Sequence, residues 1–194
     1  MTWPEPSRAL LPDGRLHLSD GPIDLIIGIE GPRATLVEAR EAAWRALNGL
    51  LPALAAEVTL LRAPLLGTPP VPRHPAAKRM VEAAWAHRTH FITPMAAVAG
   101  AVAEHVLRGI VAVPGVQLAY VNNGGDIAVH LSASSTLRVG LLEAPEAMVP
   151  DGLAVIRGGD AVRGIATSGW RGRSFSRGIA DAVTVLAIRA PEAD

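Results

Sequence analysis

Two glycine-containing segments hold the residues best suited to binding chemistry. The first is Asn122-Asn123-Gly124-Gly125-Asp126, which lies between two apolar stretches. Adjacent glycines permit positive φ angles and leave backbone N–H groups uncovered by side chains, so such a loop can wrap an anion or lie against a base or sugar. Asn-Gly is also the commonest hairpin turn, which leaves an ordinary turn as the alternative. The added amides and carboxylate favour a loop that holds a phosphate-bearing small molecule.

The second segment, residues 167–178, combines hydroxyls, glycines, arginines and two aromatic side chains. Arginine forks and hydroxyls suit phosphate oxygens, and Trp170 or Phe175 could stack on a planar ring. The alternatives are an exposed loop and a short RNA-binding segment of Arg-Gly type. The chain has 18 basic and 18 acidic residues and no formal net charge, which disfavours a nucleic-acid partner. The residues expected to bind a ligand here are Thr167, Ser168, Gly169 and Arg171.

The histidines and the missing motifs limit the range of chemistry. His87 and His90 are three residues apart and could share a helix face, but no second pair matches zinc spacing. His105 and His130 are isolated and are expected to be structural. The absence of cysteine excludes disulfides and thiolate sites. There is no serine-hydrolase elbow, P-loop or complete dinucleotide fingerprint.

The elements that must position these residues divide the chain into a helical and a β-rich part. Turn signals and apolar spacing predict a β-hairpin over 10–30 and then a long helix from Pro32 to about Leu61 that breaks or kinks at Pro52. A surface loop over 63–75 and a second helix over 76–87 follow. A third helix is expected to begin with Thr93 as its N-cap and Pro94 as its first residue. Strands are expected at 116–121, 127–131, 137–142, 153–162 and 182–188. The order indicates a single α+β domain over residues 1–194, with antiparallel β-sheet packed against several helices.

Composition indicates a folded domain that acts in solution. Hydrophobic residues make up 49% of the chain, and the N-terminus has no signal-peptide pattern. The apolar stretch Met95–Val106 is short for a membrane span and carries Glu104 and His105. We therefore expect a cytoplasmic protein without a membrane or nucleic-acid partner. The small residues of the third helix predict that this helix packs closely against another element. The oligomeric state stays open, and a homo-oligomer is one of the alternatives.

Four segments together resemble the ApbE-like superfamily, which contains the FAD:protein FMN transferases. They are the helix start at 93–100, the turn Asn123-Gly124-Gly125-Asp126, the stretch Ile165-Ala166-Thr167-Ser168-Gly169 and the stretch 180–185. The chain is most similar to the shorter, uncharacterised branch of that superfamily. The resemblance implies a T-fold-like α+β architecture whose loops, Thr93 among them, surround a flavin, FAD or FMN. It also implies magnesium at the pyrophosphate and transfer of FMN to a protein hydroxyl.

Two departures bear on catalysis. The transferases carry a His-rich stretch before the final strand, where this chain has no histidine between Ser174 and Asp181. In the family a helix of the form Asp-Ala-x-x-Thr supplies the magnesium ligands, and Asp194 matches its first residue. The chain stops there, which is consistent with a truncated or processed form. Asp194 is the expected metal ligand.

Three functions follow from these residues. The first is an ApbE-like flavin- or nucleotide-binding protein, with FMN transfer from FAD as its activity. The second is another enzyme on the same scaffold, acting on a phosphorylated or acidic metabolite with Asp126 or Asp181 as the acid or base. The third is a non-catalytic subunit that uses the small-residue helix as an interface.

Overall fold

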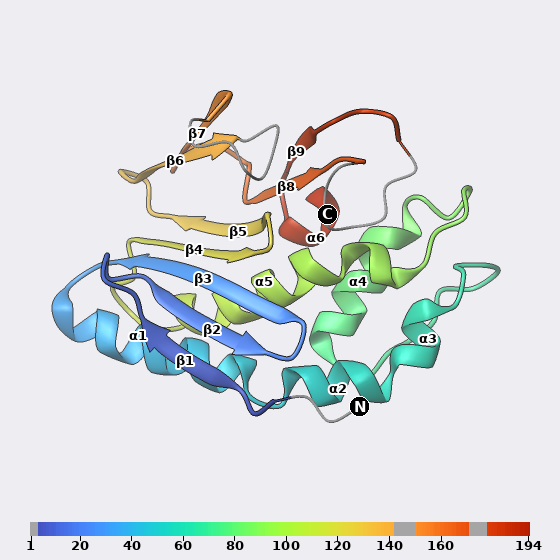
Figure 1. Cartoon of the computed structure of the whole chain (residues 1–194), viewed down its shortest axis with the longest axis horizontal. Helices are drawn as coiled ribbons and strands as arrows, with labels where there is room; N and C mark the ends of the chain where they lie inside the picture. The colour runs from blue at the N-terminus through green and yellow to red at the C-terminus, as the bar shows by residue number, and fades with distance from the viewer. Residues whose placement is uncertain (1–3, 142–149, 171–177) are drawn as a thin grey trace.

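A seven-stranded antiparallel sheet joins the two ends of the chain (Figure 1). The computed structural model describes residues 4–141, 150–170 and 178–194. The strand order is β1-β2-β3-β4-β5-β8-β9. The bounds are β1 Ser7–Leu10, β2 Leu16–Asp20, β3 Ile23–Glu30, β4 Leu118–Asn123, β5 Asp126–Leu131, β8 Gly164–Ser168 and β9 Val183–Ala187. β6 (Thr136–Leu141) and β7 (Gly152–Arg157) form a separate two-stranded hairpin.

The pairing of β3 with β4 connects the N-terminal strands to the C-terminal strands. Its register runs from Leu25 opposite Asn123 to Glu30 opposite Leu118. The expected hairpin over 10–30 is therefore the β2–β3 part of a larger sheet. The predicted α+β class, with antiparallel sheet packed against several helices, is confirmed.

One helix lies at the centre of the core. The helices are α1 (Arg33–Leu47), α2 (Leu50–Ala56), α3 (Val58–Arg62), α4 (Pro75–Trp85), the 3-10 turn η1 (Pro94–Ala97), α5 (Val98–Val111) and α6 (Ala190–Ala193). α5 packs against β4, β5, α1, α4 and α6. Its fully buried side chains Val102, Val106 and Ile110 share one apolar cluster with Leu25 and Ile27 of β3. The helices cover one face of the sheet.

The hairpin of β6 and β7 covers part of the opposite face (Figure 1). Ile156 of β7 packs with Ile127 and Val129 of β5 and with Ile165 of β8 in a second apolar cluster. The fold thus has three layers over β4, β5 and β8: helices, sheet and hairpin. Both faces of these strands are buried, as their near-continuous apolar character requires.

The apolar stretch around α5 is longer than the sequence suggested. Pro94–Val111 form 18 helical residues that meet the length and hydropathy of a membrane span, yet 56% of the stretch is buried inside the protein. Small residues explain the fit: a Cβ on Gly109 would lie 3.0 Å from Ala46 Cβ of α1, and a Cβ on Gly100 would collide with the carbonyl oxygen of Ala190. The predicted close packing is confirmed, and α5 is the core helix of this globular domain.

Two predicted helix boundaries are wrong. The long helix breaks at Asn48-Gly49, where Gly49 has a φ of 81°, and not at Pro52. Pro52 lies in the first turn of α2, where an N–H has no intrahelical partner and its loss costs little. α4 ends at Trp85, so His87 and His90 lie in the following turns and do not share a helix face.

Two elements near the C-terminus were not predicted. Residues 164–168, which lie outside every strand expected from the sequence, form β8 between β5 and β9. The expected strand over 153–162 ends at Arg157, because a turn follows in which Asp160 Oδ2 accepts from Arg157 N. A short helix, α6, precedes Asp194. Together, β8 and α6 place the C-terminal segment against α5.

Candidate carboxylate site at the start of helix α5

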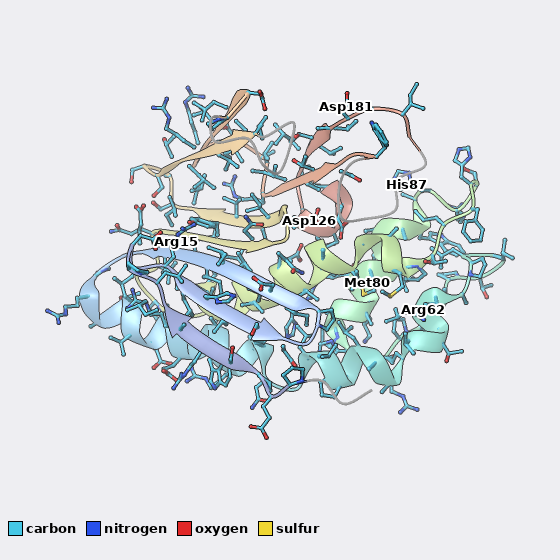
Figure 2. All side chains as sticks on the ribbon, viewed as in Figure 1. Arg15, Arg62, Met80, His87, Asp126 and Asp181 are labelled. Atoms are coloured by element: carbon cyan, nitrogen blue, oxygen red, sulfur yellow. The ribbon has the colours of Figure 1, made fainter. Side chains whose placement is uncertain are left out.

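Three chain segments meet at the N-terminus of α5. Asp126 begins β5, Asn123 ends β4, and Asp194 follows α6. Gly100 N donates to Asp194 Oδ2 at 2.8 Å, and Asn123 Nδ2 donates to Ala99 O at 3.2 Å. Figure 2 shows Asp126 near the centre of the molecule, where β5, α5 and α6 come together. The structure therefore gathers Asn123, Asp126 and Asp194, three of the residues from which the sequence predicted a ligand site; binding of a ligand there stays a prediction.

The Gly-rich segment is a tight turn between β4 and β5. Gly124 and Gly125 have φ values of 66° and 114°, which glycine adopts without strain. Gly125 N donates to Asn122 Oδ1 at 2.8 Å, so the Asn122 side chain closes the turn. The turn geometry accounts for Asn122 and both glycines, whereas Asn123 and Asp126 contribute beyond it. Whether the turn also binds a ligand stays a prediction.

Asp194 caps α5 from a distant part of the chain. Ala99 and Gly100 lie in the first helical turn, whose N–H groups have no intrahelical acceptor. Burial raises the pKa of Asp194 to about 6, although hydrogen bonds from the Gly100 and Ala99 backbones act in the opposite direction. Asp194 as a whole residue is exposed. Its carboxyl group nevertheless accepts from Gly100 N and is desolvated by the surrounding protein, so the raised pKa reflects the environment of that group.

Asp126 shares this region of negative charge. Burial and, second, the charge of Asp194 raise the pKa of Asp126 to about 7. Two neighbouring, buried carboxyl groups repel each other when both are ionised. They therefore either share a proton or bind a cation. Mg²⁺ prefers oxygen ligands and is commonly held by one or two carboxylates plus water and phosphate, so the donors suit it. No group of three or more His, Asp or Glu side chains forms a metal site among the described residues.

The other residues predicted to bind a ligand include Thr93 and two residues at the end of β8. Thr93 is the N-cap of η1, but its side chain makes no capping hydrogen bond. The end of β8 lies beside the turn: a Cβ on Gly125 would be 3.8 Å from Thr167 O. Thr167 Oγ1 bonds Thr184 Oγ1 of β9 at 2.9 Å, and Ser168 is exposed. Thr167 thus adjoins the Gly124-Gly125 turn, and the binding role of Thr93, Thr167 and Ser168 stays a prediction.

Asp181 belongs to a different part of the molecule. It is exposed in the loop before β9 and accepts from Trp170 Nε1 at 2.7 Å, while Gly169 packs against its carbonyl oxygen. Figure 2 shows Asp181 well separated from Asp126. The structure does not bring the two predicted acid–base residues together. Arg171 and Phe175 lie outside the described residues.

A buried charge cluster between α4 and α5 escaped the sequence reasoning. Arg79 and Glu104 are each 9% exposed. Arg79 Nε lies 3.6 Å from Glu104 Oε1, and Arg79 Nη2 lies 3.2 Å from His105 Nδ1. Arg189, just before α6, approaches the same Glu104 oxygen at 3.2 Å. The available signal was Glu104-His105 within a mostly apolar helix; Arg79 and Arg189 come from distant segments.

Comparisons with known proteins identify the family of the chain. A protein of Archaeoglobus fulgidus described as a UPF0280 protein is 40% identical over 106 residues, which is 53% of this chain and 40% of that protein. The chain thus aligns with less than half of that curated relative. The model of a family described as "AbpE bacteria" matches residues 8–194. Because this match spans nearly the whole chain, the protein belongs to the AbpE bacteria family.

Proposed function

We propose that the protein binds a flavin nucleotide, with FAD as the first candidate, and that it uses Mg²⁺ to do so. The observation that carries the proposal is the convergence of Asp126 and Asp194 at the start of α5, beside the Gly124-Gly125 turn. The family match and the resemblance of these segments to the FMN transferases support it. Transfer of FMN from FAD is the specific activity proposed for this site.

The capping of α5 sharpens the metal requirement. A free helix N-terminus binds phosphate directly through its N–H groups. Here Asp194 already accepts from Gly100, so its carboxylate, when ionised, puts negative charge where a phosphate would bind. A pyrophosphate could approach only with a cation between it and the carboxylates. Binding of FAD should therefore depend strongly on Mg²⁺.

Each nearby residue has a defined part in this proposal. Asp126 and Asp194 would hold the Mg²⁺, which when bound neutralises charge on the phosphoryl group. Asn123 fixes the turn against α5 through Ala99 O. The exposed backbone of Gly124 and the hydroxyls of Thr167 and Ser168 would contact phosphate or sugar oxygens. The protein's own contribution is to position the nucleotide and concentrate the negative charge that recruits the cation.

Titration of FAD with and without Mg²⁺ tests the binding proposal. We expect affinity to rise about tenfold or more with Mg²⁺, as one charge-assisted contact would produce. Asp126→Asn and Asp194→Asn should each remove the Mg²⁺ dependence. Asp24→Asn is the matched control, since Asp24 is an exposed carboxylate on β3 that pairs with His17 at 3.2 Å. No flavin binding at high micromolar FAD, with or without Mg²⁺, contradicts the proposal.

The transfer step needs its own measurement. Transfer of FMN to a hydroxyl breaks the pyrophosphate of FAD and releases AMP. We expect AMP and a flavin-labelled peptide when FAD, Mg²⁺ and an acceptor peptide with hydroxyl side chains are present, and neither product with Asp126→Asn. FAD binding without AMP release would retain flavin binding and overturn transfer to such an acceptor.

A further inference from the structure

We infer that a second site, an arginine-lined pocket beside the C-terminal half of α5, binds a small oxyanion that carries an apolar body. The pocket has a volume of about 460 Å³, within the roughly 300–1,000 Å³ of small-ligand sites. It lies between α5, β5 and the residues that flank β8 and β9. The proposed flavin function does not enter this inference.

The charge of the pocket lining favours an anion. Arg108, Arg163 and Arg189 line it together with one acidic residue, Glu104. Glu104 Oε1 is shared: it lies 3.2 Å from Arg189 Nη2 and 3.9 Å from Arg108 Nη1, and it also faces Arg79 of α4 at 3.6 Å. One carboxylate oxygen therefore serves three guanidinium groups.

Arg163 contributes a charge that no acid balances within the described part of the chain. Its guanidinium donates to three backbone carbonyls, those of Gly158, Asp160 and Val162. These acceptors are neutral, so they hold the guanidinium in place without neutralising it. Such a fixed fork is suited to a carboxylate or phosphate. Glu82 and Glu192 approach only Arg189, at 3.5 and 4.0 Å, and neither lines the pocket.

The rest of the lining indicates the body of the ligand. Leu107, Val111 and Ile188 supply apolar walls, and Ile188 is 60% exposed. His130 of β5 also lines the pocket, and its ring makes no hydrogen bond within the described part of the chain. An apolar body against these walls with an oxyanion toward the arginines would use both parts of the lining.

This pocket is distinct from the carboxylate pair. Gly100, which contacts Asp194, and Arg108 are eight residues apart on α5, which corresponds to about 12 Å along the helix. Along the chain, the two sites use opposite ends of α6, since Arg189 precedes this helix and Asp194 follows it. The two sites also carry opposite charge, so the same ligand group does not suit both.

Calorimetric titration in buffer without FAD or Mg²⁺ tests the inference independently of flavin binding. The probes are benzoate, its neutral analogue benzamide, and inorganic phosphate. We expect benzoate to bind with a dissociation constant on the order of 1 mM, as suits a small ligand, and benzamide to bind far more weakly. The phosphate arm shows which oxyanion the arginines prefer: tighter phosphate binding assigns the natural ligand to phosphate esters, and tighter benzoate binding assigns it to carboxylates.

Arg108→Met is the decisive variant. The Arg108 side chain is 69% exposed and its ion pair with Glu104 is long, so the fold should tolerate the change. We expect an affinity loss of about tenfold for the anion, and partial recovery in Arg108→Lys. Arg33→Met, which removes an exposed arginine without an ion pair among the described residues, is the charge-matched control. Equal binding of benzamide and benzoate, unchanged affinity in Arg108→Met, or no anion binding at about 20 mM overturns the inference.

Discussion

Single residues in the carboxylate site differ in how far their roles follow from the sequence. Turn chemistry is local, so Asn122, Gly124 and Gly125 could be assigned to a tight turn from neighbouring residues alone. The contact of Asp194 with Gly100 joins positions 94 residues apart, and no local pattern encodes it. The family resemblance identified Asp194 as a candidate metal ligand, and only the folded structure shows that it contacts Gly100. Asp181 shows the opposite case, since a plausible acid lies away from the carboxylate pair.

His105 should make the stability of the protein sensitive to mild acid. Burial, followed by the charges of His74 and Arg79, lowers the pKa of His105 to about 4. The unfolded chain binds a proton near pH 6.5 and the folded chain does not, so stability is complete above that pH and falls as pH drops toward 4. Because the ring keeps some solvent contact, we expect a loss of about 1 kcal/mol between pH 7 and 5.

Urea unfolding at pH 7 and 5 measures this effect. His105→Gln keeps an acceptor near Arg79 and cannot titrate, so its free energy of unfolding should fall less with acid than that of the wild type. His90→Gln, in an exposed turn, is the matched control. An equal fall in the wild type and His105→Gln would show that other groups cause the acid sensitivity.

At the scale of elements, the break between α1 and α2 allows the effects of Gly49 and Pro52 on the end of a helix to be compared. Gly49 has a φ of 81°, which costs an L-residue about 1 kcal/mol. Gly49→Ala should therefore lower the free energy of unfolding by about that amount. Pro52→Ala should change it by less than about 0.5 kcal/mol, because residue 52 needs no intrahelical donor. The same denaturation measurement compares both variants; a larger effect at Pro52 would restore proline as the cause of the break.

The contact of α6 with α5 depends on one glycine. A Cβ at Gly100 would collide with the Ala190 carbonyl, so Gly100→Ala must displace α6 and weaken the bond from Gly100 N to Asp194. We expect destabilisation of about 1–3 kcal/mol, despite the higher helix propensity of alanine. Gly159→Ala, where a Cβ meets nothing within 4 Å, is the control. A melting temperature at or above that of the wild type would refute this packing role.

The elements that the sequence predicted correctly are those with local signals. Periodic apolar spacing identified α1, and Thr93-Pro94 marked the start of the helical stretch that comprises η1 and α5. The short strand β8 and the four-residue α6 carry no such signal. β8 exists because it pairs with β5 and β9, and α6 because its buried residues Ala190 and Ala193 pack against α5. Tertiary contacts created both, so composition and periodicity could not indicate them.

At the scale of the whole molecule, buried charges join three distant chain segments. Arg79 lies on α4, Glu104 on α5 and Arg189 before α6, and both arginines approach the same glutamate oxygen. The sequence predicted the helices but not this charge cluster. Pairing between charges so far apart in the sequence follows from the packing of α4, α5 and α6. The cluster holds the C-terminal segment, and thus Asp194, against the core.

Glu104→Gln should therefore destabilise the molecule as a whole. Removing the carboxylate leaves the buried Arg79 guanidinium without its acid, a loss that typically costs several kcal/mol; with the retained amide we expect about 2–3 kcal/mol. Glu38→Gln removes an exposed ion pair with Arg45 and should cost about 0.5 kcal/mol or less. Denaturant unfolding gives both values, and limited proteolysis should show faster cleavage near Arg189 in Glu104→Gln alone. If Glu104→Gln matches Glu38→Gln in both measurements, the cluster does not anchor the C-terminal segment, and the close packing of the Ala190 backbone against Gly100 holds α6 instead.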